Sequence, residues 1–194
     1  RFLETPYEGL RIRNRKLEGL LLVSLEEAGQ QFPITVIPAN RPGFYVVIDG
    51  ERRVRGLRKL GRDVVRAQVL NLTASEALLW VRVGQTAVPL TALEQGLLIR
   101  ELVECHELTM DTIAVRFGRS KSWVSRRLDL VQILPEPVQR MVVAGQIPPS
   151  SAMKVLVPVA RANGEHAHIL ARAIADGKLS TRDVERLYDY YRSP

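Results

Sequence analysis

The fold of the second half of the chain is decided at residues 108–128, which read LTMDTIAVRFGRSKSWVSRRL. Thr109 is placed to cap a helix that ends before Gly118, a residue that tolerates the left-handed conformation of a tight turn. Ser120 is placed to cap a second helix, for which Val124 and Leu128 supply an inner face. Two short helices joined in this way predict a helix-turn-helix over about residues 109–128.

The outward face of the second helix carries cations and hydroxyls. Residues 112–127 contain five basic side chains and no acid. Such a surface suits the major groove, where donors at the start of a recognition helix meet base edges. The alternative is an ordinary helical hairpin with a solvated face, but such faces usually mix both signs, as residues 101–107 do. The predicted DNA-binding residues are Arg119, Ser120, Lys121, Ser122, Trp123, Ser125 and Arg126, with Arg127 also facing outward.

Outward from this motif, the sequence divides into two parts. Helical spacing dominates after about residue 74, whereas β-branched runs at 34–37, 45–48 and 64–70 predict three strands before it. Helical patterns at 17–28 and 51–60 alternate with these strands. We therefore predict an α+β chain, with a small mixed α/β domain at residues 1–88 and an all-α helix-turn-helix domain at 89–194.

A second basic cluster follows the second predicted strand, in the stretch IDGERRVRGLRKLG at residues 48–61. A strand, a glycine turn and the start of a basic helix bring backbone N–H groups and guanidinium groups together, which favours phosphate binding. A basic surface helix is the alternative. The candidate anion-binding residues are Gly50, Glu51, Arg52, Arg53 and Arg55.

The composition of the 194 residues excludes several classes of protein. One cysteine cannot form a disulfide framework, and three scattered histidines do not indicate a metal centre. No apolar run is long enough to span a bilayer, so we expect no membrane partner. The net charge of +7 favours a polyanionic partner. The chain begins at Arg1 and has no signal-peptide pattern, so we interpret the chain as a fragment of a cytoplasmic, nucleoid-associated protein.

Residues 108–152 resemble the DNA-binding region of the ParB partition proteins. The matching motifs are IAVRFG at 113–118, SWVS at 122–125, LPEPVQ at 134–139 and GQIPPS at 145–150. The resemblance implies sequence-specific binding to double-stranded DNA, at a palindromic site, in plasmid or chromosome partition. It also implies a homodimer formed through DNA- or nucleotide-induced contacts and a C-terminal domain missing here, and a ParA-type ATPase as partner.

The resemblance extends to the first half. The family box G-E-R-R-x-R is matched at residues 50–55, and GQQFPI at 29–34 resembles a second box. In the family these boxes contact CTP, so Gly50, Glu51, Arg52, Arg53 and Arg55 become nucleotide-binding candidates in a ParB/sulfiredoxin-like fold. The third box, E-N-x-Q-R, holds magnesium, and the corresponding residues 83–87 read VGQTA. Because that Glu and Asn are absent, we expect CTP to bind without a metal ion, and we assign no metal ligand.

Three enzymatic alternatives compete with this interpretation. A CTPase clamp with real turnover would need the missing metal box, so we assign no catalytic residue. A sulfiredoxin-type reaction would use Cys105, but Glu101, Glu104 and Glu107 surround this residue, whereas a reactive thiolate needs cationic neighbours. A nuclease needs clustered carboxylates, and Asp49 with Glu51 is the one close pair. Nucleoid occlusion or transcription control on the same scaffold remains open beside partition.

Overall fold

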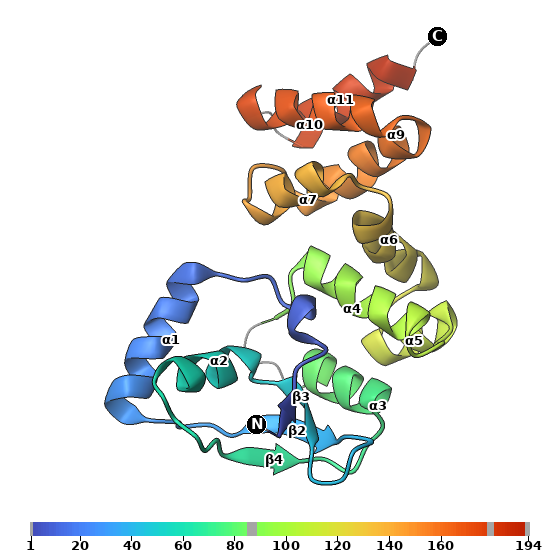
Figure 1. The fold of residues 1–194 in the computed structure, drawn as a ribbon. Coiled ribbons are helices and arrows are strands. Elements are labelled where there is room, and N and C mark those ends of the chain that lie inside the picture. Colours follow the sequence, from blue (N-terminus) through green and yellow to red (C-terminus); the bar gives the residue numbers. More distant parts are fainter. Residues whose placement is uncertain (1, 85–88, 178–180, 193–194) are drawn as a thin grey trace. The chain divides into compact units, whose positions relative to one another are not determined.

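The computed structural model describes residues 2–84, 89–177 and 181–192. The chain forms two compact units, Arg1–Leu90 and Thr91–Pro194. The first combines a sheet with helices and the second is helical in its described residues, which confirms the predicted α+β class (Figure 1). No described helix has the length and apolarity that a bilayer span requires.

The sheet of the first unit has four strands in the order β1-β3-β2-β4. The central pair, β2 (Ile34–Pro38) and β3 (Tyr45–Asp49), is antiparallel, while β1 (Leu3–Glu4) runs parallel to β3 and β4 (Ala67–Val69) parallel to β2. The three predicted strands are present, although β4 is shorter than the run at 64–70. Strand β1 was not predicted, because two residues are too few to show a strand pattern.

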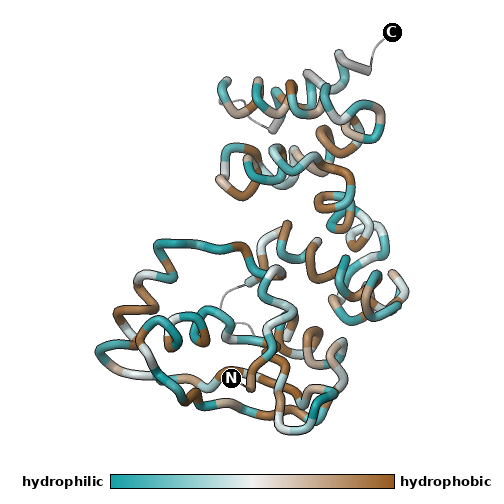
Figure 2. Tube along the Cα trace, viewed as in Figure 1, coloured by the Kyte–Doolittle hydropathy of each residue, from teal (hydrophilic) through white to brown (hydrophobic). Residues whose placement is uncertain are grey.

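Helices of the first unit follow local signals that the sequence carries. They are η1 (Glu8–Leu10), α1 (Arg15–Ala28), α2 (Glu51–Lys59), α3 (Ala74–Leu79) and η2 (Trp80–Gly84). Asn14 caps α1 by accepting a hydrogen bond from the Leu17 N–H, and Thr73 forms a capping box at α3. The strands are drawn mainly in brown and α2 mainly in teal in Figure 2, because the strands supply the core and α2 is largely polar.

The second unit contains only helices among its described residues. They are α4 (Ala92–Glu104), α5 (Met110–Phe117), α6 (Lys121–Gln132), α7 (Glu136–Val143), α8 (Pro149–Ser151), η3 (Ala152–Leu156), α9 (Val157–Ala162), α10 (Gly164–Gly177) and α11 (Thr181–Arg192). Fully buried side chains such as Ile99, Leu130 and Leu156 form its core. Packing against this core fixes the orientation of α6, which carries the predicted DNA-binding surface.

Helices α4 and α6 cross closely at Gly96. A Cβ atom built at this position would lie 2.4 Å from the carbonyl oxygen of Arg127 and 3.1 Å from Cγ1 of Val131. Real Cβ atoms do not approach backbone oxygens so closely. Glycine is therefore required at this crossing, and it lets α6 sit directly against α4.

Candidate nucleic-acid and anion-binding sites

Helices α5 and α6 have the geometry of a helix-turn-helix. The Thr109 hydroxyl accepts a hydrogen bond from the Thr112 N–H, and the Ser120 hydroxyl accepts one from the Trp123 N–H. Between the helices, Gly118 adopts a left-handed conformation with φ 60° and ψ 39°. Both N-caps and the turn lie where the sequence places them. Buried residues on α5 and α6 then hold the two helices together.

The predicted DNA-binding residues lie at the start of α6 and on one side of it. Arg119, Ser120, Lys121, Ser122 and Arg126 are exposed, whereas Trp123 and Ser125 are half-buried. One cation of this surface already has a partner, since Lys121 Nζ lies 2.8 Å from a carboxylate oxygen of Asp111. This ion pair is exposed, and such pairs contribute little and exchange readily for a phosphate. The face therefore offers cations and hydroxyls to a polyanion.

Trp123 is less available than the sequence suggested, because aromatic and cationic side chains pack against it. Its ring centroid lies 5.5 Å from that of Phe117. The guanidinium carbon of Arg127 lies 5.0 Å from the ring centroid, and that of Arg119 lies 5.8 Å away. These distances are within the range of cation–π attraction. The indole therefore orders two guanidinium groups beside the proposed DNA surface.

The outward placement of Arg127 was wrong. Its Nε donates to Oε1 of Gln95 at 2.8 Å, and its Nη1 lies 2.7 Å from Sδ of Met153. Burial lowers the pKa of Arg127 from its ordinary value, and the charges of Arg119 and Arg126 act in the same direction. Arg127 thus fastens α6 to its neighbours inside the second unit and does not belong to the exposed surface.

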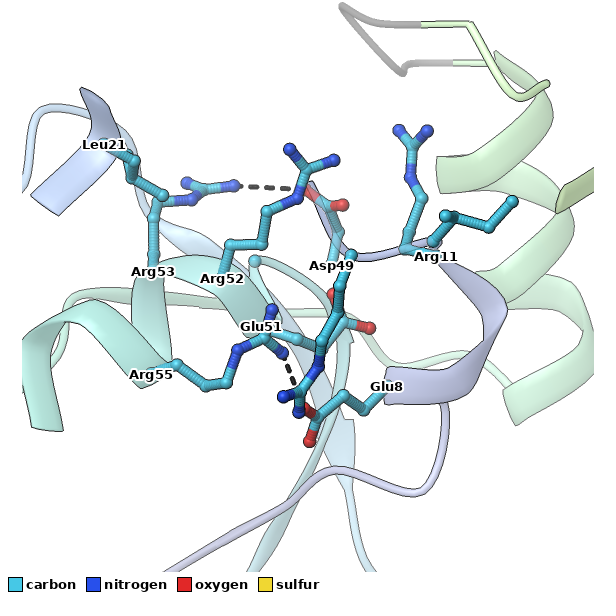
Figure 3. A pocket seen from close by; sticks show the side chains of 11 residues that line it. Glu8, Arg11, Leu21, Asp49, Glu51, Arg52, Arg53 and Arg55 are labelled. Carbon is cyan, nitrogen blue, oxygen red and sulfur yellow. Dashed lines mark hydrogen bonds and ion pairs between the residues drawn. The ribbon is translucent and has the colours of Figure 1, made fainter. Parts of the chain in front are cut away.

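The anion-binding candidates of the first unit gather at the start of α2. Gly50 caps this helix in the left-handed region at φ 104°, and a Cβ there would lie 2.5 Å from Cγ2 of Ile34. A cavity of about 210 Å³ opens beside it and is lined by all five candidates. Figure 3 shows Arg52, Arg53 and Arg55 projecting around this opening. The structure therefore brings the candidate residues together.

The three arginines of this cluster differ in their partners. Arg53 donates to the carbonyl oxygens of Phe32 and Pro33 and to Asp49, with 2.8 Å to Phe32 and 3.1 Å to Asp49. Arg55 pairs with Glu8 at 2.7 Å and with Glu18. Arg52, in the described part of the chain, makes no hydrogen bond or ion pair. It is the guanidinium of the box that is free to meet an anion.

Glu51 is buried and faces a residue that sequence reasoning missed. Arg82, from η2, donates to Glu51 and lies 3.9 Å from an oxygen of Asp49. Desolvation by burial raises the pKa of Glu51, against the opposing attraction of Arg82. The signal was a lone arginine inside the apolar run 77–83, a position where a charge needs a buried partner. Asp49 and Glu51 are therefore tied to arginines, which disfavours the nuclease reading.

The structure describes only part of residues 83–87, the segment that corresponds to the metal box, since Gln85 and Thr86 lie outside the described residues. Two carboxylates that flank this segment in the sequence, those of Glu76 and Glu94, take part in capping boxes at helix starts. The Glu76 carboxylate accepts a hydrogen bond from the Thr73 N–H at 3.0 Å, and the Glu94 carboxylate accepts one from the Thr91 N–H at 2.9 Å. The described residues form no group of three potential metal ligands.

The surroundings of Cys105 disfavour the sulfiredoxin-type reading. This residue is exposed and follows the last residue of α4. The negative charge of Glu101 raises the pKa of the Cys105 thiol, with smaller contributions from desolvation and from Glu104. A reactive thiolate requires the opposite shift.

Models of known protein families match both units of the chain. A family model described as the ParB HTH domain matches residues 88–193, and one described as the ParB N-terminal domain matches residues 11–82. The chain belongs to the ParB family. Its N-terminal match contains the Gly50–Arg55 cluster, and its helix-turn-helix match contains α5 and α6.

Relatives of this ParB-family chain include nucleoid occlusion proteins and chromosome-partitioning proteins. A nucleoid occlusion protein of Bacillus cytotoxicus is 32% identical over 85% of this chain and 56% of its own length. The chromosome-partitioning protein ParB of Caulobacter vibrioides is 31% identical over 84% of this chain and 52% of its own length. The chain thus spans about half the length of these relatives.

A solved structure agrees with the fold. The C-terminally truncated chromosome-partitioning protein ParB from Caulobacter crescentus, complexed to the centromeric parS site, has a TM-score of 0.53 and 28% identity. The match covers 97% of this chain and 96% of that one. Both units of the present chain therefore have counterparts in one ParB structure.

Proposed function

We propose that this chain is the DNA-binding part of a ParB-family partition protein and recognises a double-stranded, palindromic site. The observation that carries the proposal is the exposed start of the capped helix α6, where residues 119–127 carry cations and hydroxyls and no acid. Its helix start presents hydroxyl and cationic donors, the groups that read base edges and neutralise phosphates. The structure of a ParB relative complexed to parS supports the same assignment.

A single helix-turn-helix contacts few base pairs, so tight binding requires two copies. We propose that two chains meet on the two halves of a palindrome, through DNA- or nucleotide-induced contacts and a C-terminal domain beyond the 194 residues. A ParA-type ATPase is the proposed partner in partition, at the nucleoid. Tight one-to-one binding to a lone half-site at physiological salt would contradict this arrangement.

The recognition surface is tested with Lys121→Ala and Arg126→Ala, compared with Arg172→Ala, an equal change of charge on α10 outside the motif. A side chain that reads a base should lose about 1–3 kcal/mol of specific binding free energy. A side chain that contacts phosphate should keep sequence preference and lower the salt slope by about one unit. Fluorescence anisotropy on a selected duplex measures both. Unchanged affinity and slope in both variants would remove α6 from the interface.

Nucleoid occlusion is a second candidate, favoured by the relative of that name in Bacillus cytotoxicus. Relatives of both kinds match this chain to a similar extent, so the positions of the bound DNA sites must distinguish the two functions. Genome-scale DNA capture with the full-length protein distinguishes them. Sites clustered near one locus support partition, whereas sites spread around the chromosome support occlusion, and sites at promoters support transcription control.

The first unit is proposed to respond to CTP through the Gly50–Arg55 cluster, forming a nucleotide-responsive clamp. Arg52 is the counter-charge for the phosphates, because Arg53 and Arg55 already have partners. Arg53→Ala would also remove bonds to two backbone carbonyls, so Arg52→Ala is the cleaner probe. Without a metal, CTP should bind modestly, with a dissociation constant of about 10–1000 μM.

Calorimetry with magnesium, and then with a chelator, tests the metal-free expectation. We expect similar CTP affinity in both conditions and slow or absent hydrolysis. Strictly magnesium-dependent, sub-micromolar binding would instead support the CTPase clamp with real turnover. No binding of any nucleotide would reduce the cluster to a basic surface helix.

A further inference from the structure

Helix α1 carries apolar side chains on two opposite sides. On one side it packs against α2, where a Cβ built at Gly56 would lie 2.7 Å from Cδ1 of Leu25 and 3.9 Å from Cδ1 of Leu22 (Figure 1). On the other side, Leu20 and Val23 are 61% and 52% exposed. A surface helix ordinarily turns polar residues toward solvent. The side of α1 that faces away from α2 is therefore apolar, and the described residues leave it largely uncovered.

Residues of opposite charge stand at the two ends of this apolar pair. Lys16 precedes Leu20 by four positions, and Glu27 follows Val23 by four. Spacings of three and four residues place side chains on one line along a helix. The side chains of Lys16 and Glu27 are exposed and make no ion pair or hydrogen bond with the described part of the chain. We call the line formed by Lys16, Leu20, Val23 and Glu27 the outer face of α1.

The outer face of α1 is complementary to itself. Lys16 and Glu27 lie equally far from the middle of the helix, and so do Leu20 and Val23. When two copies of α1 pack antiparallel about a twofold axis, each Lys16 faces Glu27 of the other copy. Each Leu20 then meets Val23 of the other copy. Parallel packing would instead bring like charges together, so the charges select the antiparallel arrangement.

We propose that the outer face of α1 binds a second copy of this chain, which packs its own α1 antiparallel against it. Gly19 and Ser24 border this face, and their small size lets a second helix approach. A contact confined to one helix of 14 residues is small, so the dissociation constant should be about 10–500 μM. The contact goes beyond the proposed function, because it requires neither DNA nor a nucleotide and uses no residue of α6 or of the Gly50–Arg55 cluster.

Sedimentation equilibrium of the 194-residue chain measures this association up to about 1 mM, without DNA or nucleotide. A reducing agent is present, because Cys105 is exposed. The variant Leu20→Gln/Val23→Gln should associate roughly tenfold more weakly than the wild type, because it loses the apolar contact. The matched control is Val64→Gln/Ile169→Gln, which removes two apolar side chains outside α1 that are 81% and 63% exposed. The control should stay within about twofold of the wild type.

Charge reversal tests the antiparallel pairing itself. Lys16→Glu brings two acids together at each end of the contact, and Glu27→Lys brings two cations together. Each single variant should associate roughly fivefold more weakly at low ionic strength. The double variant Lys16→Glu/Glu27→Lys restores opposite charges and should return to within about twofold of the wild type. Both reversals suit the dipole of α1, so a loss of association in the single variants cannot come from a damaged helix.

Three outcomes would overturn the proposal. The first is a wild type that stays monomeric at the highest concentration, whether or not its α1 then binds another protein or anionic vesicles. The second is a control variant that loses as much association as Leu20→Gln/Val23→Gln. The third is a double charge reversal that stays as weak as the single variants. Failure of the DNA and CTP proposals is read separately, from the α6 variants and from Arg52→Ala.

Discussion

Replacing Gly96 by alanine should destabilise the second unit, because α4 and α6 have no room for a methyl group between them. The new Cβ would lie 2.4 Å from the Arg127 carbonyl oxygen. Ordinary van der Waals contact begins near 3.4 Å, so α6 must move by about 1 Å. The opposing atom belongs to the backbone of a packed helix, and no side-chain rotation can relieve the contact.

The change in the free energy of unfolding caused by Gly96→Ala follows from two opposing effects. Overpacking costs about 1–3 kcal/mol, and a rigid backbone neighbour places Gly96→Ala in the upper part of that range. Alanine regains about 0.8–1.0 kcal/mol through its better helix propensity. The net loss in the free energy of unfolding is therefore about 1–2 kcal/mol. For a unit of this size that corresponds to a melting temperature lower by roughly 4–16 °C.

Urea unfolding followed by tryptophan fluorescence measures this loss. The chain has two tryptophans, so a Trp80→Phe background leaves Trp123 as the reporter of α6. The control is Gly19→Ala, the same change in α1, where a Cβ meets nothing within 4 Å; it is read in a Trp123→Phe background, which leaves Trp80 as the reporter of the first unit. The control should gain about 0.5–1 kcal/mol of stability. If Gly96→Ala proved as stable as the wild type, the close crossing of α4 and α6 would be refuted.

Three further substitutions test the charged core and the helix start of the first unit. Arg82→Met leaves the carboxylate of Glu51 buried without its guanidinium, and urea unfolding should show a loss of about 3–5 kcal/mol; a neutral effect would contradict the buried pair. The pKa of Glu18 is lowered by Arg55, so this pair stabilises the fold at neutral pH and loses its effect as the pH falls through the lowered pKa. Glu18→Gln should therefore melt earlier than the wild type at pH 7, with a gap that closes in acid; a gap that widens would reverse the sign. Gly50→Ala combines a left-handed φ with a Cβ 2.5 Å from a core side chain, so its melting temperature should fall, and an unchanged value would refute the strained turn.

The sequence alone determined the local architecture. The helix-turn-helix was readable because its signals lie within a few residues of one another: Thr109 and Ser120 as caps and Gly118 as the turn. The central strands were readable from β-branched runs for the same reason. The clustering of Gly50, Glu51, Arg52, Arg53 and Arg55 could also be predicted, since residues 50–55 are contiguous and must lie together at the start of one helix.

Only the tertiary structure decided which of the charged side chains are available. Arg55 pairs with residues 47 and 37 positions away, and Arg127 bonds to Gln95, 32 positions away. Arg82 likewise reaches Glu51 across 31 positions. Short-range patterns fix backbone conformation, whereas a long guanidinium side chain bonds to whatever the folded chain brings near it. The sequence therefore placed the arginines on their helices, and packing alone decided that Arg52 has no partner among the described residues while Arg53 and Arg55 are bound.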